Sequence, residues 1–187
     1  MSSSFRAANT ARITASAPAY ALEPPSTWRA ALGLAAALLV QASLAPYLTF
    51  RGTSISFVLL AVLWYATRAG AARGLVFGLI AGACEDALAG GSAPAWTFST
   101  GAIGFVWGRS SGTHFAEARA WLVAGAFVAT LLRYGMYAAV LQAAGRPLAL
   151  PGTHFHAILW QSALNALAML VALALAARLG DTFESRG

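Results

Sequence analysis

From Trp28 onward, long apolar runs alternate with short breaks of polar residues, glycine and proline. The apolar segments cover residues 28–46, 53–67, 73–89, 94–108, 119–143 and 154–179. An α-helix needs about 20 apolar residues to cross a bilayer core about 30 Å thick, and the first, fifth and sixth segments meet that length. The other three, at about 15 to 17 residues, are marginal. They are expected to thin the bilayer locally, to be buried by the longer helices, or to form a re-entrant hairpin.

Aromatic residues lie close to the ends of these segments, which is typical of side chains at the level of the lipid headgroups. They are Trp28, Tyr47, Trp64, Tyr65, Trp96, Trp107 and Trp121. The pattern predicts an all-α integral membrane protein with six transmembrane helices over residues 28–180. Residues 1–27, rich in Ser, Ala and Thr, are predicted to be a disordered tail, with an organelle transit peptide as the alternative. Residues 181–187 are predicted to form a second, short tail.

Composition favours the membrane interpretation, because 59% of the residues are hydrophobic and only 10% are charged. A soluble domain typically carries about 25% charged residues. All twelve basic residues are arginines, and they lie singly between the apolar runs. A nucleic-acid surface would instead need a basic cluster on a polar body, so no nucleic-acid partner is expected.

The distribution of the arginines predicts the orientation. With six spans, one side of the membrane holds nine of them, namely Arg6, Arg12, Arg29, Arg68, Arg73, Arg109, Arg119, Arg178 and Arg186. The other side holds only Arg51 and Arg146. The positive-inside rule therefore predicts that both termini are cytoplasmic.

Glycines recur at four-residue intervals in the stretch from residue 70 to residue 109. The first set is Gly70, Gly74, Gly78 and Gly82, and Asp86 and Gly90 continue the same four-residue spacing. The next apolar segment carries a second set, Gly101, Gly104 and Gly108. Small residues at this spacing let two helices approach closely in a bilayer. The stretch is predicted to be a tightly packed helical hairpin, whose glycine face serves either internal packing or the docking of a partner helix.

Three charged residues are predicted to lie within the membrane: Glu85, Asp86 and Arg133. A charge near the middle of the bilayer costs at least about 2.5 kcal/mol on insertion scales and usually has a partner in the interior of the bundle. We expect Arg133 to pair with Asp86 or, failing that, with Glu85. The alternative is that Arg133 faces a wet outer vestibule and contacts only water and carbonyl groups.

Catalytic patterns have little support in this sequence. It contains neither an HExxH nor a GxSxG motif, and its glycine-rich stretches lack the Lys-Ser/Thr ending of a phosphate-binding loop. Glu85 and Asp86 are adjacent, and adjacent side chains on a helix diverge, so they are not expected to form an acidic dyad. With a single cysteine, Cys84, no thiol metal site is expected. We therefore expect no enzymatic activity, no metal and no cofactor.

The glycine-rich stretch resembles the bacterial rod shape-determining protein MreD family. That family shows Gly-x3-Gly-x3-Asp, a glycine-containing turn, and a small-residue helix that ends in Gly-Arg. The matching positions here are Gly78, Gly82, Asp86, Gly90, Gly91, Gly101, Gly104, Gly108 and Arg109. The match covers about a quarter of the chain, and Tyr47 and the Ala-Gly-Gly-Ser-Ala-Pro turn depart from the family pattern.

The resemblance implies a non-enzymatic multi-pass scaffold in the bacterial inner membrane that acts in cell shape and peptidoglycan synthesis. Its implied partners are the lipid bilayer and an MreC-like single-span protein. Through the latter it would reach RodA, the transpeptidase that works with RodA, and MreB filaments. The six-helix fold of the family is similar to the substrate-binding S components of energy-coupling-factor vitamin transporters. The alternative function is therefore that of an S component, in which Arg133, Asp86, Glu85, Trp96 and Gln142 could line a substrate pocket.

Overall fold

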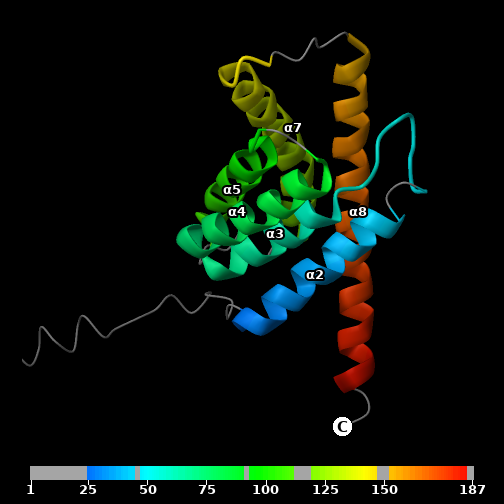
Figure 1. The fold of residues 1–187 in the computed structure, drawn as a ribbon. Helices are drawn as coiled ribbons and strands as arrows, with labels where there is room; N and C mark the ends of the chain where they lie inside the picture. Colours follow the sequence, from blue (N-terminus) through cyan, green and yellow to red (C-terminus); the bar gives the residue numbers. More distant parts are fainter. Residues whose placement is uncertain (1–24, 45–46, 91–92, 112–118, 147–151, 185–187) are drawn as a thin grey trace, which may run out of the picture.

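The computed structural model describes residues 25–44, 47–90, 93–111, 119–146 and 152–184, with the side chains of the last range described from residue 155 to residue 178. The described residues are almost entirely helical (Figure 1). The helices are α2 (Thr27–Leu44), α3 (Phe57–Ala69), α4 (Ala71–Leu88), α5 (Ala95–Gly108), α7 (Arg119–Ala143) and α8 (Gly152–Glu184). Between α2 and α3, a tight turn closes an isolated β-bridge from Phe50 to Thr53.

Three of these helices are long and apolar enough to cross a membrane: α2, α7 and the Phe155–Arg178 portion of α8. They correspond to the first, fifth and sixth apolar segments, which are the three predicted to be long enough to cross a bilayer. The all-helical prediction is confirmed for the described residues, whereas six spans and cytoplasmic termini stay predictions. Helix α8 continues to Glu184, past the boundary predicted at residue 180. Most of the predicted N-terminal tail, residues 1–24, lies outside the described residues.

The α4–α5 hairpin forms the most closely packed part of the fold, with the two helices antiparallel. Gly74 of α4 lies against Gly104 of α5, and one turn further along α4, Gly78 lies against Thr100 and Gly101. Such backbone contact is possible because neither helix places a Cβ between them. The close-packed hairpin predicted from the glycine spacing is therefore present (Figure 1).

Helix α3 precedes the hairpin and is joined to it by Gly70 alone, which has a φ of 87°. An L-residue with a side chain rarely adopts this conformation, so glycine is needed here for the reversal of the chain. Gly70 was expected on the helical face that runs to Gly82. That expectation is wrong, and the face begins at Gly74.

The contacts give the helix cluster two distinct ends. At one end, α2, α4 and α7 begin while α3 and α5 end. Thr27, at the start of α2, and Arg73, in the first turn of α4, line the same groove. The ring of Trp107, near the end of α5, stacks on that of Trp121, near the start of α7, with centroids 6.4 Å apart. We call this the arginine end, because it carries Arg29, Arg68, Arg73, Arg109 and Arg119. The opposite end, where α2 and α4 finish and α3 and α5 start, is called the network end.

Apolar side chains of α3, α5 and α7, together with Met169 of α8, make up the main core. Leu59, Leu63, Ile103, Ala126 and Ala129 are fully buried in it. Helix α8 stands beside this group and packs chiefly against α7 (Figure 1). It runs antiparallel to α7, because Gln161 contacts Tyr134 while Asn165 contacts Thr130. Arg178 consequently lies toward the arginine end.

Candidate functional site

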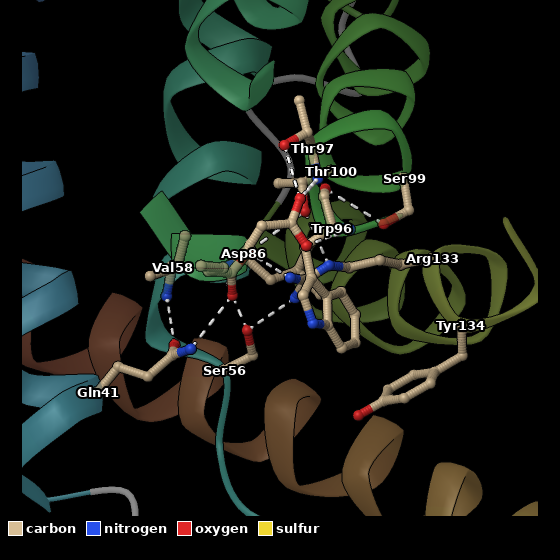
Figure 2. Close-up of polar contacts among 12 residues, drawn as sticks. Gln41, Ser56, Val58, Asp86, Trp96, Thr97, Ser99, Thr100, Arg133 and Tyr134 are labelled. Atoms are coloured by element: carbon tan, nitrogen blue, oxygen red, sulfur yellow. Dashed lines mark hydrogen bonds and ion pairs between the residues drawn. The ribbon is translucent and has the colours of Figure 1, made fainter. Parts of the chain in front are cut away.

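A buried ion pair between Arg133 of α7 and Glu85 of α4 occupies the network end. Arg133 is 3% exposed and Glu85 is 7% exposed. The guanidinium donates from Nη2 to Glu85 Oε2, and from Nε to Thr100 Oγ1 at 2.9 Å. Its Nη1 donates to Ser56 Oγ, also at 2.9 Å, and its Cζ lies 4.4 Å from the centroid of the Trp96 ring (Figure 2). The cation is therefore held by a carboxylate, two hydroxyl groups and an aromatic face.

Helix α2 joins this pair through the side-chain amide of Gln41. Its Nε2 donates to Glu85 Oε1, and its Oε1 accepts from the backbone N–H of Val58, each at 3.1 Å (Figure 2). Since Val58 is in the first turn of α3, Gln41 satisfies a backbone donor that has no partner within that helix. One side chain thus connects α2 to both α3 and α4.

Helix α8 joins the same network through Asn165, which is fully buried. Asn165 Oδ1 accepts from the backbone N–H of Ser56 at 2.8 Å, and its Nδ2 donates to Thr130 Oγ1 at 2.9 Å. Ser56 is also the N-cap of α3, since its hydroxyl oxygen accepts from the N–H of Leu59. All six described helices therefore contribute to one layer of buried polar contacts.

Asp86 does not pair with Arg133, and the expectation that it would be the preferred partner is wrong. Its carboxylate accepts from the backbone N–H groups of Trp96 and Thr97 at 3.0 and 2.8 Å, and from Thr97 Oγ1 at 2.7 Å (Figure 2). The second choice, Glu85, is the partner that the structure shows. Adjacent residues on a helix point about 100° apart, so Glu85 faces the interior while Asp86 faces the start of α5.

The role of Asp86 is to cap α5 from a neighbouring helix. The first turn of a helix has N–H groups without partners and a partial positive charge. Pro94, the residue at the N-cap position of α5, makes no side-chain cap hydrogen bond. The Asp86 carboxylate fills that role and at the same time fixes the α4–α5 turn.

Asp86→Ala is expected to lower the free energy of unfolding by about 1 to 2 kcal/mol, because two N–H groups at the start of α5 lose their acceptor. Asp86→Asn, which keeps one acceptor oxygen, is expected to lie between the alanine variant and the unsubstituted protein. Thermal unfolding of the three purified proteins in the same mild detergent measures the order. An alanine variant as stable as the unsubstituted protein would contradict the capping role.

The glycine face of α4 is used for packing within the chain. A Cβ on Gly78 would lie 2.5 Å from the carbonyl oxygen of Thr100, and one on Gly82 would overlap the backbone of Trp96. From the α5 side, Gly104 meets Gly74, Gly101 meets the Leu79 side chain, and Gly108 meets the backbone of Ala71. Of the two uses left open by the spacing, internal packing is the one that these contacts show.

Gly90 departs from this pattern, as Gly70 does. It follows α4 with a φ of 61°, and an added Cβ would meet open space. Its four-residue spacing from Asp86 therefore reflects a turn and not a helix face. Gly91, which also carries the resemblance, lies outside the described residues.

Gly125 of α7 was not singled out from the sequence, although it is as tightly packed as the hairpin glycines. A Cβ there would overlap the indole Nε1 of Trp107, a buried nitrogen that has no hydrogen-bond partner among the described residues. No second glycine stands four residues away to signal the site. Ser56, Thr100 and Thr130 were also missed. The side-chain amides of Gln41, Gln161 and Asn165 form interhelical hydrogen bonds, which are common for polar residues within membrane helices.

A cavity of about 440 Å³ adjoins the ion pair. Its polar wall is formed by Gln41, Ser54, Ser56, Glu85, Trp96, Arg133, Tyr134 and Gln161. Tyr134 donates its hydroxyl hydrogen to Gln161 Oε1 at 2.7 Å on one side of this space. Arg133 therefore lines this cavity while paired with an acid, and the alternative in which it contacts only water and carbonyl groups is wrong. Asp86 and Gln142 are not among the lining residues.

Comparisons with protein-family models, with curated proteins and with solved structures find no match to this chain. Among the described residues, no three His, Cys, Asp or Glu side chains come together as a group that could hold a metal ion. The fold and the site define an α-helical protein with three helices long and apolar enough to cross a membrane, and with a charged pair buried where its helices meet.

Proposed function

We propose that this chain is a non-enzymatic, multi-pass scaffold of the bacterial inner membrane that acts in the cell-elongation machinery in the manner of MreD. The observation that carries the proposal is that the residues matching the MreD pattern pack together in one helical hairpin. Gly78, Gly82, Gly101 and Gly104 bring α4 and α5 into backbone contact, and Asp86 caps α5. A pattern whose parts serve one compact hairpin is better explained by a shared fold than by apolar composition alone.

The distribution of charge supports six spans with cytoplasmic termini as part of the proposal. Of the arginines described outside the ion pair, only Arg51 and Arg146 belong to the network end. The arginine end carries Arg29, Arg68, Arg73, Arg109 and Arg119, with Arg178 of α8 toward the same side. Under the positive-inside rule, the arginine end is the cytoplasmic one. The polar cavity then opens in the outer half of the membrane.

The proposed partner is an MreC-like single-span protein, through which the chain would act on RodA, its transpeptidase partner and MreB filaments. Because the α4–α5 glycine face is occupied within the chain, the partner helix has to dock elsewhere. Large apolar side chains remain exposed along α8, including Leu167, Leu170, Val171 and Leu175. In a bilayer such a face accepts either lipid or another helix.

A second candidate function, that of a small-molecule carrier similar to an S component, is favoured by the cavity. Its volume of about 440 Å³ falls in the range of small-ligand sites, and its wall combines a buried charged pair with aromatic and amide groups. In this case the ion pair would orient a bound molecule, in addition to holding the helices together.

Co-purification separates the two functions. The tagged chain is expressed together with an MreC-like protein from the same genome, solubilised in mild detergent and analysed for retained protein and for retained small molecules. The scaffold proposal expects the single-span protein in a fixed ratio, both with the unsubstituted chain and with Gln161→Leu, which changes the cavity wall and removes the acceptor of the Tyr134 hydroxyl. The carrier function would be favoured over the scaffold function by a different result. In that result the unsubstituted chain retains a vitamin-sized molecule but no single-span protein, and Gln161→Leu abolishes retention of the molecule.

A further inference from the structure

A second groove, distinct from the polar cavity, lies between α2 and α4 with α3 at its base. Its volume is about 400 Å³. The lining residues are mostly apolar: Ala30, Ala31, Leu34, Tyr65, Ala72, Val76, Phe77 and Ile80, with Thr27 and Arg73 at one end. The rings of Tyr65 and Phe77 stack with centroids 4.3 Å apart. The groove is therefore an apolar channel with a polar end.

The polar end of the groove coincides with the arginine end of the helix cluster. Arg73 lines it directly, Arg29 is in the first turn of α2, and Arg68 precedes the Gly70 turn. Among the side chains that the structure describes, the carboxylates are those of Glu85 and Asp86, at the opposite end of α4. The potential at this end of the groove is positive, with no nearby described acid to neutralise it.

Aromatic contacts of the arginines indicate that this end lies at the level of the lipid headgroups. The guanidinium of Arg68 lies 4.5 Å from the Trp64 ring centroid, and that of Arg29 lies 5.6 Å from the Trp28 ring centroid. Tryptophan and arginine together at a helix end are typical of the membrane interface. The apolar part of the groove then extends from this level toward the middle of the bilayer.

The length and lining of the groove suit an acyl chain. Between Arg73 and Ile80 it follows α4 for about 10 Å, at 1.5 Å per residue. Along this length its walls are apolar side chains of α2 and α4 and the stacked rings of Tyr65 and Phe77. An apolar wall that ends at a basic side chain is complementary to an acyl chain joined to an anionic headgroup.

We propose that this groove binds one anionic phospholipid from the leaflet at the arginine end. An acyl chain lies between α2 and α4, on the stacked rings of Tyr65 and Phe77, and the headgroup phosphate lies beside Arg73. Basic groups between transmembrane helices at the cytoplasmic side attract anionic headgroups, and a guanidinium matches two phosphate oxygens. The lipid also fills the space beside α2, of which only Ala30 and Leu34 are buried by the chain itself.

Native mass spectrometry of the full chain tests this proposal. The detergent-solubilised protein is titrated with phosphatidylglycerol and, separately, with phosphatidylcholine of identical acyl chains. One phosphatidylglycerol is expected to be retained more tightly than phosphatidylcholine. Arg73→Gln is expected to weaken phosphatidylglycerol retention about fivefold, the loss predicted for one arginine near a headgroup, and to leave phosphatidylcholine unchanged. Arg146→Gln, at the other end of the cluster, is the matched control and is expected to change neither.

A second variant tests the apolar part of the groove without touching charge. Ala31→Leu combined with Ala72→Leu narrows the channel at two exposed positions, so folding is expected to be retained while both lipids are lost. Equal retention of the two lipids by the unsubstituted protein would overturn the proposal, as would phosphatidylglycerol binding that survives both the charge variant and the filled groove. If the unsubstituted protein formed a dimer without bound lipid, and the double leucine variant were monomeric, the groove would be the contact surface for a second copy of the chain.

Discussion

Glu85→Ala is expected to destabilise the folded protein by about 3 kcal/mol or more, the largest effect that we predict for a single polar side chain here. The substitution leaves the Arg133 guanidinium buried without its counter-ion, and breaking one side of a buried pair typically costs about 3 to 5 kcal/mol. It also removes the acceptor of the Gln41 amide, which holds α2 to the cluster. Unfolding of the purified protein in mild detergent, followed by tryptophan fluorescence, measures the loss.

A double-substitution cycle distinguishes the ion pair from a general loss of packing. Glu85→Leu combined with Arg133→Leu removes both charges together, and is expected to cost clearly less than the sum of the two single variants. Arg146→Gln, an exposed arginine, is the control and should stay within about 0.5 kcal/mol of the unsubstituted protein. Single costs that simply add in the double variant would show that the two side chains do not stabilise each other.

The choice between Glu85 and Asp86 as the partner of Arg133 shows what can be predicted from the sequence and what cannot. A lone arginine within an apolar segment requires a partner, and only Glu85 and Asp86 stood at a matching position, so the sequence restricted the choice to a pair. The choice itself depends on the rotation of α4 about its axis. That rotation follows from where α5 starts, and the first turn of α5 binds Asp86. No pattern within α4 contains this information.

The glycine spacing predicted close helix packing correctly, but it did not identify the neighbour. Gly74, Gly78 and Gly82 would serve an internal helix or a partner helix equally well, because a backbone groove has no side chains to specify what fills it. The same count also included Gly70 and Gly90, which the structure places in turns with positive φ. Spacing alone cannot separate a glycine that permits close contact from one that permits a reversal of the chain.

The polar network as a whole was beyond prediction for a related reason. Serine and threonine in an apolar helix can satisfy their own hydroxyl groups on a backbone carbonyl of the preceding turn, as Thr130 does with Ala126. Ser56 and Thr100 therefore gave no signal that they would contact Arg133. The side-chain amides of Gln41 and Asn165 cannot be satisfied so locally, and both form hydrogen bonds with residues of other helices.

Gly82→Ala is expected to have one of the largest effects of an added methyl group among the described glycines. The new Cβ would overlap the carbonyl oxygen of Trp96 and would lie 2.6 Å from the Cα of Thr97. Both atoms belong to the backbone at the start of α5, so neither can move aside without shifting the helix that Asp86 caps. We expect a loss of about 3 kcal/mol or more, at the upper end of the range for overpacking.

Gly33→Ala provides a matched control with the opposite expected sign. Gly33 is also within a helix, α2, but an added Cβ there meets nothing within 4 Å. Because alanine is the better helix former by about 1 kcal/mol, this variant should be neutral or slightly more stable. Measured in one detergent, the melting temperature should fall for Gly82→Ala and should stay unchanged or rise slightly for Gly33→Ala. If Gly82→Ala kept its melting temperature and lost only an MreC-like partner, the glycine face would be an external docking surface, contrary to the packing that the structure shows.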